Sequence, residues 1–304
     1  LRKLSIRSVF NDHSAMLHVF FGLKIRTVRH RTTIFAYSGL RAFLSESTLL
    51  RLCSQLPYST TYVIFVVRLL ARSNVIPTLG LLTPFLTNVK IFVQDLWAKQ
   101  LAWDDPLDAS DRQRWSELRE ELKSPLPTIP RLVVSRKATS DSSELCVFGD
   151  ASKRVYACCA YLLCRSQSAS SSRLVMAKSH LNDFKPITIP RSELLAVHIS
   201  VRLAQYVVNQ LDINISSVYV FSDSQIALHW IHSSRQFKTF VQNRVKAIKD
   251  IVASFRQRNI TTKFHYVASQ DNLADCATRG LSTKDSQGHI WWSGPSFLLS
   301  PPSQ

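Results

Sequence analysis

An aspartate stands in the middle of strand-like sequence. Residues 146–164 read CVFGDASKRVYACCAYLLC, so Asp150 lies between two apolar runs. Removing a carboxylate from water costs several kcal/mol unless the group is paired or binds a metal. The stretch therefore predicts two buried strands, with Asp150 meeting partners from elsewhere in the chain.

Apolar spacing after residue 143 predicts alternating strands and helices. Short apolar runs separated by polar turns are typical of an antiparallel meander, and apolar residues at spacings of three and four indicate helices. The expected elements are strands at 145–149, 155–164 and 173–180, a helix opened by Pro190, a strand at 216–224, helices at 225–231 and 237–255, a strand at 262–268 and a last helix within 271–281. This order predicts an α/β fold, a mixed sheet with helices packed on it.

Four carboxylates fall at comparable places in this order. Asp150 and Asp223 end strands, whereas Glu193 and Asp275 lie in the first turns of helices. Three of them have a simpler explanation: Glu193 complements a helix N-terminus, Asp223 caps a helix, and Asp275 does either. If the four carboxyl groups meet, their mutual repulsion calls for Mg2+ or Mn2+, which prefer oxygen ligands, rather than zinc. We expect these carboxyl groups to converge.

A short segment is strongly basic. The chain has a net charge of +17, and residues 235–263 hold eight Lys or Arg against a single acid, Asp250. Lys238, Lys246 and Lys249 lie opposite the apolar stripe of the expected helix. Such a face suits a polyanion, because lysines near phosphates release condensed counterions. A merely solvated helix face is an equal alternative.

Other features argue against a secreted or membrane protein. The six cysteines show no CxxC pair and are interpreted as reduced, buried thiols of an intracellular protein. The apolar run YVIFVV at 62–67 stops at Arg68, far short of the ~20 residues of a membrane span. Because the chain starts with Leu and has no signal-peptide pattern, we interpret it as a piece of a longer protein.

Seven motifs follow one another from about 145 to 298: FGDAS, LVMAKS, IPRSELLAV, VFSDSQIALHWI, KTFVQNRV, DNLADCATRGL and WWSGPSFL. In content and order they resemble the ribonuclease H (RNase H) domain of Bel/Pao-type long-terminal-repeat retrotransposons. Residues 79–107 are similar to the connection region that precedes this domain. The resemblance implies an RNase H-like fold, with helices on both faces of a mixed five-stranded sheet and a mostly helical connection segment before it.

The resemblance also implies roles for residues. Four acids match the family's ligands for two Mg2+ ions, with Mn2+ as a substitute: Asp150, Glu193, Asp223 and Asp275. The implied activity is two-metal-ion hydrolysis of the RNA strand of RNA:DNA hybrids. Asp150 bridges both ions in that mechanism. Nucleic-acid contacts are expected from Lys238, Lys246, Lys249, Ser224 and Gln225. Tyr266 occupies the slot of the family's loop histidine, so we expect neighbouring His265 to be an ordinary strand residue.

We expect four segments: a decayed, poorly defined end of reverse transcriptase at 1–78, the connection region and linker at 79–140, the RNase H-like domain at 141–285 and a C-terminal tail at 286–304. IPTLG stands where the family reads Asp-Pro-Leu-Gly, which keeps open a catalytically silent, nucleic-acid-binding remnant. The expected partners are an RNA:DNA hybrid and the rest of the Pol polyprotein, including reverse transcriptase and integrase. The expected compartment is the cytoplasm, including virus-like particles, with the nucleus as an alternative. Polymerase, peptidase and zinc-module motifs are missing from this sequence.

Overall fold

The computed structural model describes residues 23–28, 31–36, 80–101, 105–123, 143–165, 170–185 and 187–300. The first two ranges form an antiparallel hairpin of β1 (Leu23–Val28) and β2 (Arg31–Ala36). Most of the segment expected to be a decayed end of reverse transcriptase, 1–78, lies outside the described residues.

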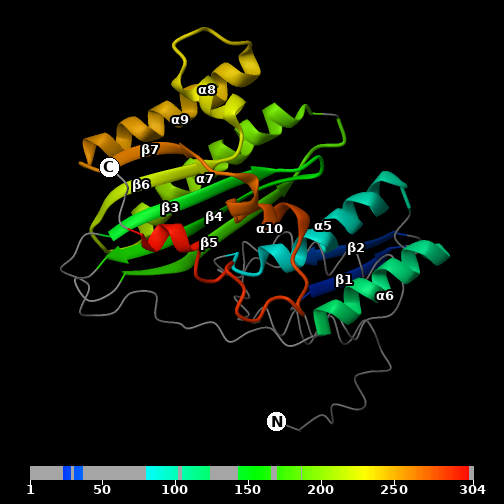
Figure 1. The fold of residues 1–304 in the computed structure, drawn as a ribbon. Coiled ribbons are helices and arrows are strands. Elements are labelled where there is room, and N and C mark those ends of the chain that lie inside the picture. Colours follow the sequence, from blue (N-terminus) through cyan, green and yellow to red (C-terminus); the bar gives the residue numbers. More distant parts are fainter. Residues whose placement is uncertain are drawn as a thin grey trace.

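A mixed five-stranded sheet forms the centre of the fold (Figure 1). In the order β5-β4-β3-β6-β7, its strands are β5 (Ser170–Leu181), β4 (Val155–Arg165), β3 (Ser143–Ala151), β6 (Ile215–Ser222) and β7 (Thr261–Tyr266). The first three are antiparallel neighbours, whereas β6 is parallel to both β3 and β7. The chain reaches β6 through α7 (Ile189–Gln210) and β7 through α8 (Gln225–His232) and α9 (Thr239–Gln257). A short helix, α10 (Ala274–Arg279), follows β7.

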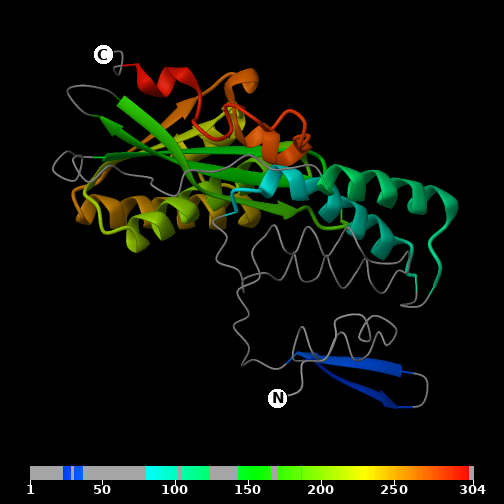
Figure 2. The ribbon, with the colours of Figure 1, turned by 90° about the horizontal axis from the view of Figure 1, so that it is seen from below.

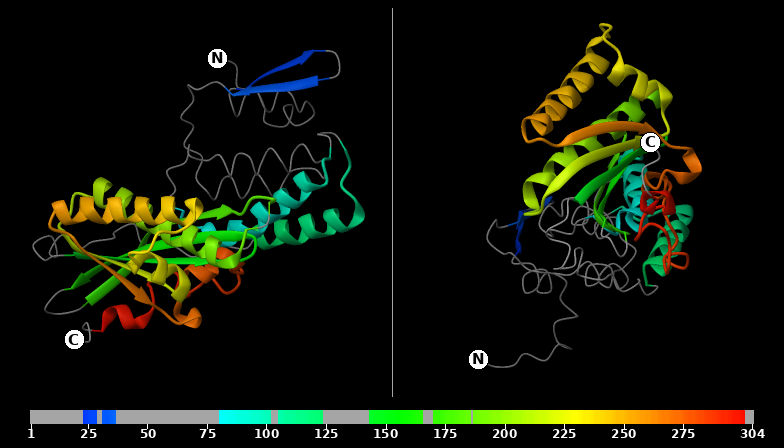
Figure 3. Two further views of the ribbon diagram at one scale, coloured as in Figure 1. Left: turned by 90° about the horizontal axis from the view of Figure 1, so that it is seen from above. Right: turned by 60° about the vertical axis from the view of Figure 1, so that its left-hand side comes forward.

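Both faces of the sheet are covered. Side chains alternate along β3, so Val147 joins the core beneath α7 and α9, whereas Phe148 joins the core on the α10 side. Cys158 and Cys159 divide in the same way along β4. Figure 3 shows α7 and α9 on one side of the sheet and the C-terminal segment on the other. Burial on both faces explains why these central strands are almost continuously apolar.

The strand and helix order predicted from the sequence is confirmed, with one local correction. We expected Glu193 in the first turn of its helix, but α7 begins at Ile189 and its first turn holds no acid. Proline has a fixed φ and no N–H, which the first turn tolerates. The helix begins at Ile189, one residue before Pro190, so Glu193 lies in its second turn.

Within the described residues, two further helices precede the sheet in the chain. They are α5 (Thr83–Ala98) and α6 (Ala109–Lys123), which Figure 2 shows beside one end of the sheet. Trp115 of α6 stacks on Phe92 of α5, with ring centroids 5.9 Å apart. Thr87 of α5 also donates to the Ala277 carbonyl of α10 at 2.8 Å. These helices lie in the expected connection segment, of which 124–140 falls outside the described residues.

Residues 286–300 pack against the sheet. Tyr161 Oη donates to the Trp291 carbonyl at 2.9 Å, and Trp291 Nε1 donates to the Leu81 carbonyl at 2.9 Å. Trp291 and Leu298 are both buried in the core on the α10 side. The core of the fold therefore continues past the expected domain boundary at 285.

The five cysteines within the described residues are all unpaired. Cys53 lies outside the described residues. The prediction of unpaired, buried thiols is confirmed for Cys146, Cys158, Cys159 and Cys164, and Cys276 is free and half-buried. Among the described helices, none has the length and apolar character needed to cross a membrane.

Candidate active site

Asp150 lies near the C-terminal end of β3 and is almost fully buried, with 8% of its surface exposed. Burial raises the pKa of this carboxyl to about 6, and the negative charges of Asp223 and Asp275 act in the same direction. A hydrogen bond from Thr278 Oγ1 to Asp150 Oδ2, at 2.5 Å, opposes that rise. The buried strand thus carries an acid whose charge is disfavoured by its surroundings.

Asp223 is brought beside Asp150 by the parallel pairing of β3 and β6. Gly149 is paired with Ser222, so the residues that follow them emerge at the same edge of the sheet. Asn272 bridges the two strands, because its Nδ2 donates to the Gly149 carbonyl at 3.1 Å and to Asp223 Oδ1 at 3.2 Å.

The simpler explanation of Asp223 as a helix cap is wrong. The N-cap of α8 is Ser224, whose Oγ accepts a hydrogen bond from the Ala227 N–H at 3.1 Å. The carboxylate of Asp223 instead accepts from Ser269 Oγ at 2.7 Å and from Asn272. Asp223 is therefore held by residues from the loop after β7.

Glu193 approaches the same region from α7. Its Oε2 accepts a hydrogen bond from the hydroxyl of Ser224, which joins the second turn of α7 to the N-terminus of α8. Burial and the charge of Asp223 raise the pKa of Glu193, and the Ser224 hydrogen bond lowers it. Glu193 is thus close enough to Asp223 for the two charges to interact.

Asp275 lies in the first turn of α10, as predicted. Arg279 Nε donates to Asp275 Oδ1 at 2.5 Å across one turn of the helix, and both side chains are substantially exposed. Asp275, followed by Asp150 and Asp223, raises the pKa of Arg279. Arg279 therefore lies in the field of three of the four acids.

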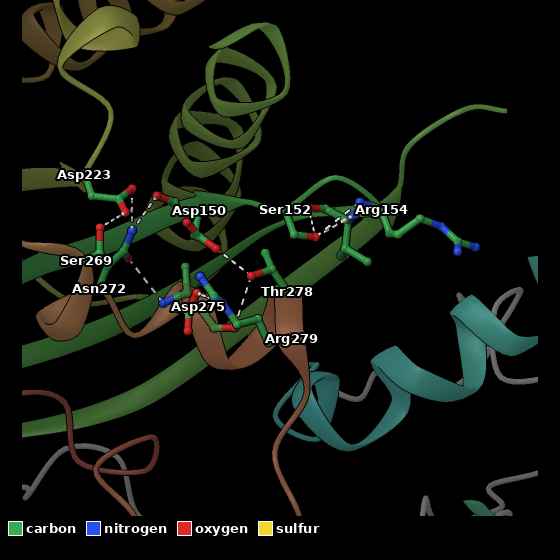
Figure 4. Close-up of polar contacts among 12 residues, drawn as sticks. Asp150, Ser152, Arg154, Asp223, Ser269, Asn272, Asp275, Thr278 and Arg279 are labelled. Atoms are coloured by element: carbon green, nitrogen blue, oxygen red, sulfur yellow. Dashed lines mark hydrogen bonds and ion pairs between the residues drawn. The ribbon is translucent and has the colours of Figure 1, made fainter. Parts of the chain in front are cut away.

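Three of the acids surround one end of the sheet, and their individual donors hold them there. Figure 4 shows Asp223, Asp150 and Asp275 around that end, with Thr278 reaching Asp150 from α10. Within the described parts of the chain, no three His, Cys, Asp or Glu side chains are placed so that they could hold one metal ion. Like charges repel, and each carboxylate here is turned toward its own hydrogen-bond donor.

The chemistry of the donor set suits a hard divalent cation. All four predicted ligands are carboxylates, and Mg2+ and Mn2+ prefer oxygen. Asp150 forms no ion pair with the described residues, and its pKa is raised partly by neighbouring negative charge. A divalent cation at this edge would relieve that repulsion.

The basic face of α9 is exposed, as its pattern predicts. Lys246 and Lys249 are exposed, whereas the preceding residues Val245 and Ile248 are buried, and Lys238 is exposed at the N-cap. Gln225, the first residue of α8, is exposed as well. Ser224, by contrast, is buried and hydrogen-bonded to Glu193, so its hydroxyl serves the acid site directly.

His265 is an ordinary residue of β7. Its ring stacks on Phe221 with centroids 5.7 Å apart and lies 5.9 Å from the Tyr219 ring. Burial and the charge of Lys263 lower the pKa of His265. Tyr266, the next residue, has 54% of its surface exposed.

The sequence patterns did not assign roles to several residues that hold the acids in place. Thr278, Arg279 and Asn272 all belong to the motif DNLADCATRGL, yet their roles depend on contacts with other elements. Helical spacing offers a partial signal, since Thr278 and Arg279 follow Asp275 by three and four residues and share its side of the helix. Ser269 carried no comparable signal.

A family model described as the Pao retrotransposon-like RNaseH-like domain matches residues 71–224, just over half of the 304-residue chain. The match includes Asp150, Glu193 and Asp223, and Asp275 lies beyond it. No curated protein matches the chain.

Solved structures that align with the chain include three RNases H. The N-terminal RNase H domain of a Mycobacterium tuberculosis protein is 12% identical, over 48% of this chain and 94% of that one, with a TM-score of 0.33. RNase H1 of the archaeon Halobacterium salinarum is 10% identical, over 48% and 96%, with a TM-score of 0.32. LC11-RNase H1, solved with an RNA/DNA hybrid, is 14% identical, over 44% and 91%, with a TM-score of 0.31. On the strength of the family match, the chain belongs to the Pao retrotransposon-like RNaseH-like domain family.

Proposed function

We propose that this chain is a divalent-metal-dependent endonuclease that hydrolyses the RNA strand of RNA:DNA hybrids during retrotransposon reverse transcription. The observation that carries the proposal is that Asp150, Asp223 and Asp275 lie around one end of the sheet, where burial and the charges of Asp223 and Asp275 raise the pKa of Asp150. A fold stabilised only by apolar packing has no use for such a group. The family membership supports the same activity.

The four acids would hold the metal ions: Asp150, Glu193, Asp223 and Asp275. When bound, two Mg2+ ions, or Mn2+ in their place, would promote ionisation of the attacking water and neutralise charge on the leaving 3′ oxygen.

Neighbouring side chains orient these acids. Thr278 fixes one oxygen of Asp150, and Asn272 ties Asp223 to the backbone of β3. Ser224 holds one oxygen of Glu193. Such outer contacts fix the direction of a ligand's lone pairs, and their loss commonly lowers metal affinity or activity by about 10- to 100-fold.

The basic face of α9 would hold the nucleic acid. Lys238, Lys246 and Lys249 are exposed and can approach phosphates without disturbing the buried face of the helix. Phosphate contacts orient a nucleic acid but carry no sequence information. We therefore expect binding that depends on salt and not on base sequence.

A cleavage assay with hybrid and duplex substrates tests the proposed function. With Mg2+ present, the RNA strand of a labelled hybrid should be cut and duplex DNA spared, because the ribose 2′-hydroxyl distinguishes RNA from DNA. A chelator should stop the reaction. Equal cutting of all strands would show a general nuclease, and hybrid binding without cutting would support the silent remnant.

We propose, in addition, that the chain acts as part of a Pol polyprotein, beside reverse transcriptase and integrase, in the cytoplasm or in virus-like particles. The family membership supports this context. Purification of the native polyprotein with antibodies against this segment would identify the attached domains by mass spectrometry.

A further inference from the structure

A buried asparagine joins three segments, two of which directly adjoin Asp150 or Glu193 in the sequence. Asn182 follows the last residue of β5 and is 6% exposed. All of its polar groups have partners. In the backbone, its N–H donates to the Arg154 carbonyl at 2.7 Å and its carbonyl accepts from Gln94 Nε2 at 2.6 Å. In the side chain, Nδ2 donates to the Ser152 and Lys153 carbonyls at 3.2 and 3.1 Å, and Oδ1 accepts from Ser192 Oγ at 3.0 Å.

The first of these segments is the turn between β3 and β4. This turn begins directly after the strand that carries Asp150, and Ser152 braces it by bonding with both the N–H and the carbonyl of Val155. Asn182 holds the two turn carbonyls of Ser152 and Lys153. Its amide therefore fixes the end of the strand that presents Asp150.

The second segment is the beginning of α7. Ser192 immediately precedes Glu193, is completely buried, and donates its hydroxyl hydrogen to Asn182. One side-chain amide thus contacts the turn after Asp150 and the residue before Glu193. It links the strand and the helix that carry these two acids.

The third segment is α5, from the expected connection region. Gln94 donates to the Asn182 carbonyl, and its Oε1 accepts from Arg154 Nε and Nη2 at 3.2 and 2.8 Å. Asp95, the next residue, pairs with Arg154 at 2.5 Å. The C-terminal part of α5 is therefore bonded both to Asn182 and to Arg154 of the turn between β3 and β4.

We propose that Asn182 is a positioning residue that sets the spacing between Asp150 and Glu193, and that Gln94 of α5 supports it from the connection region. The inference rests on the proposed function, because two ligands of one metal centre need a fixed separation. Buried amides with every hydrogen bond satisfied are well suited to fixing such separations. The metal-binding unit then includes residues from before position 141.

Two serines of α7 provide a matched test. Ser192→Ala removes the bond to Asn182 with little change in volume, whereas Asn182→Leu removes three bonds at once and risks unfolding. Ser200→Ala is the control, because Ser200 is equally buried but donates to the Ala196 carbonyl at 2.8 Å and approaches the Phe148 carbonyl, away from the turn. Mn2+ affinity is measured by electron paramagnetic resonance, and thermal unfolding without metal reports stability.

Both serine variants should lose similar stability, but Ser192→Ala alone should weaken Mn2+ binding, by roughly tenfold or more. Gln94→Met, which keeps the side-chain length, should also weaken Mn2+ binding. If the wild-type protein binds Mn2+ and the Ser192→Ala and Ser200→Ala variants bind it with equal affinity, the inference is overturned. The proposed function would still stand. Unchanged affinity in Gln94→Met would remove α5 from the assignment. A wild-type protein that binds no Mn2+ would contradict both proposals.

Discussion

Thr278 in α10 donates a hydrogen bond to Asp150 in β3 across 128 residues of sequence, with 2.5 Å between Oγ1 and Oδ2. The bond joins β3, the middle strand of the sheet, to α10. It also favours the charged form of Asp150, against the effect of burial. The protonation state of Asp150 therefore depends on how α10 is placed.

Replacing Thr278 with valine should raise the pKa of Asp150 above its value of about 6. Valine keeps the shape of threonine but cannot donate, so the charged carboxylate is deprived of a stabilising hydrogen bond. A carbon-detected NMR titration of the aspartate carboxyls measures this directly. A pKa that stays the same or falls would show that the Thr278 hydroxyl does not act on Asp150.

Asp150→Asn should stabilise the metal-free protein at pH 8. The folded-state pKa of Asp150, about 6, lies above the ordinary 3.8, so wild-type stability is lost as the pH rises from about 3.8 through 6. Asparagine is neutral throughout and escapes that loss, which is on the order of 3 kcal/mol for a shift of this size. Chemical denaturation at pH 8 and pH 4 should show the variant's advantage at pH 8 and little difference at pH 4. A wild-type protein that is the more stable one at pH 8 would contradict the burial-driven shift.

Asp223→Asn should abolish RNA cleavage and leave the fold intact. The change removes a charge with little change in volume, and direct loss of a metal ligand should exceed the roughly 100-fold that outer contacts can contribute. Asp250→Asn, the same change on an exposed part of α9, is the control. Cleavage rates and circular dichroism are compared for the three proteins. Retained cutting by Asp223→Asn would mean that Asp223 has no part in the reaction.

The order of strands and helices could be predicted because it depends on local spacing. The apolar spacing of an element depends only on residues within that element. Around Cys158 and Cys159, for example, successive residues alternate between the two buried faces of the sheet. Boundaries depend on finer effects. The helix α7 begins at Ile189, one residue before Pro190. Glu193 therefore lies in its second turn and not in the expected first turn.

The supporting contacts of the site could not be predicted, because their partners are remote in sequence. Asp223 and Ser224 are adjacent and both suit an N-cap, but α8 begins at Gln225, so Ser224 takes the role. Asn272 reaches the Gly149 carbonyl over 123 residues of sequence. Spacing rules describe neighbours on one element, whereas these bonds follow from how distant elements pack.

Replacing Lys238, Lys246 and Lys249 together with glutamine should weaken hybrid binding about equally for every sequence. The slope of log K against log salt should flatten by up to roughly 0.9 for each lysine that neutralises a phosphate in the wild-type complex. The apolar side of α9, including Val245 and Ile248, is unaltered, so the thermal midpoint should change little. Fluorescence anisotropy at several salt concentrations provides the measurement. Unchanged affinity and slope would show that this surface is a solvated helix face.

Single-turnover cleavage of an end-labelled RNA strand in an RNA:DNA hybrid, followed across a Mg2+ titration, tests the central claim most directly. The wild-type protein should cut the RNA with a saturable dependence on Mg2+, stop on addition of chelator, and leave 3′-hydroxyl and 5′-phosphate ends. Asp150→Asn should bind the hybrid with unchanged affinity and leave it intact. Wild-type protein that binds the hybrid but leaves the RNA whole at every concentration of Mg2+ or Mn2+ would contradict the claim and identify the chain as a silent remnant.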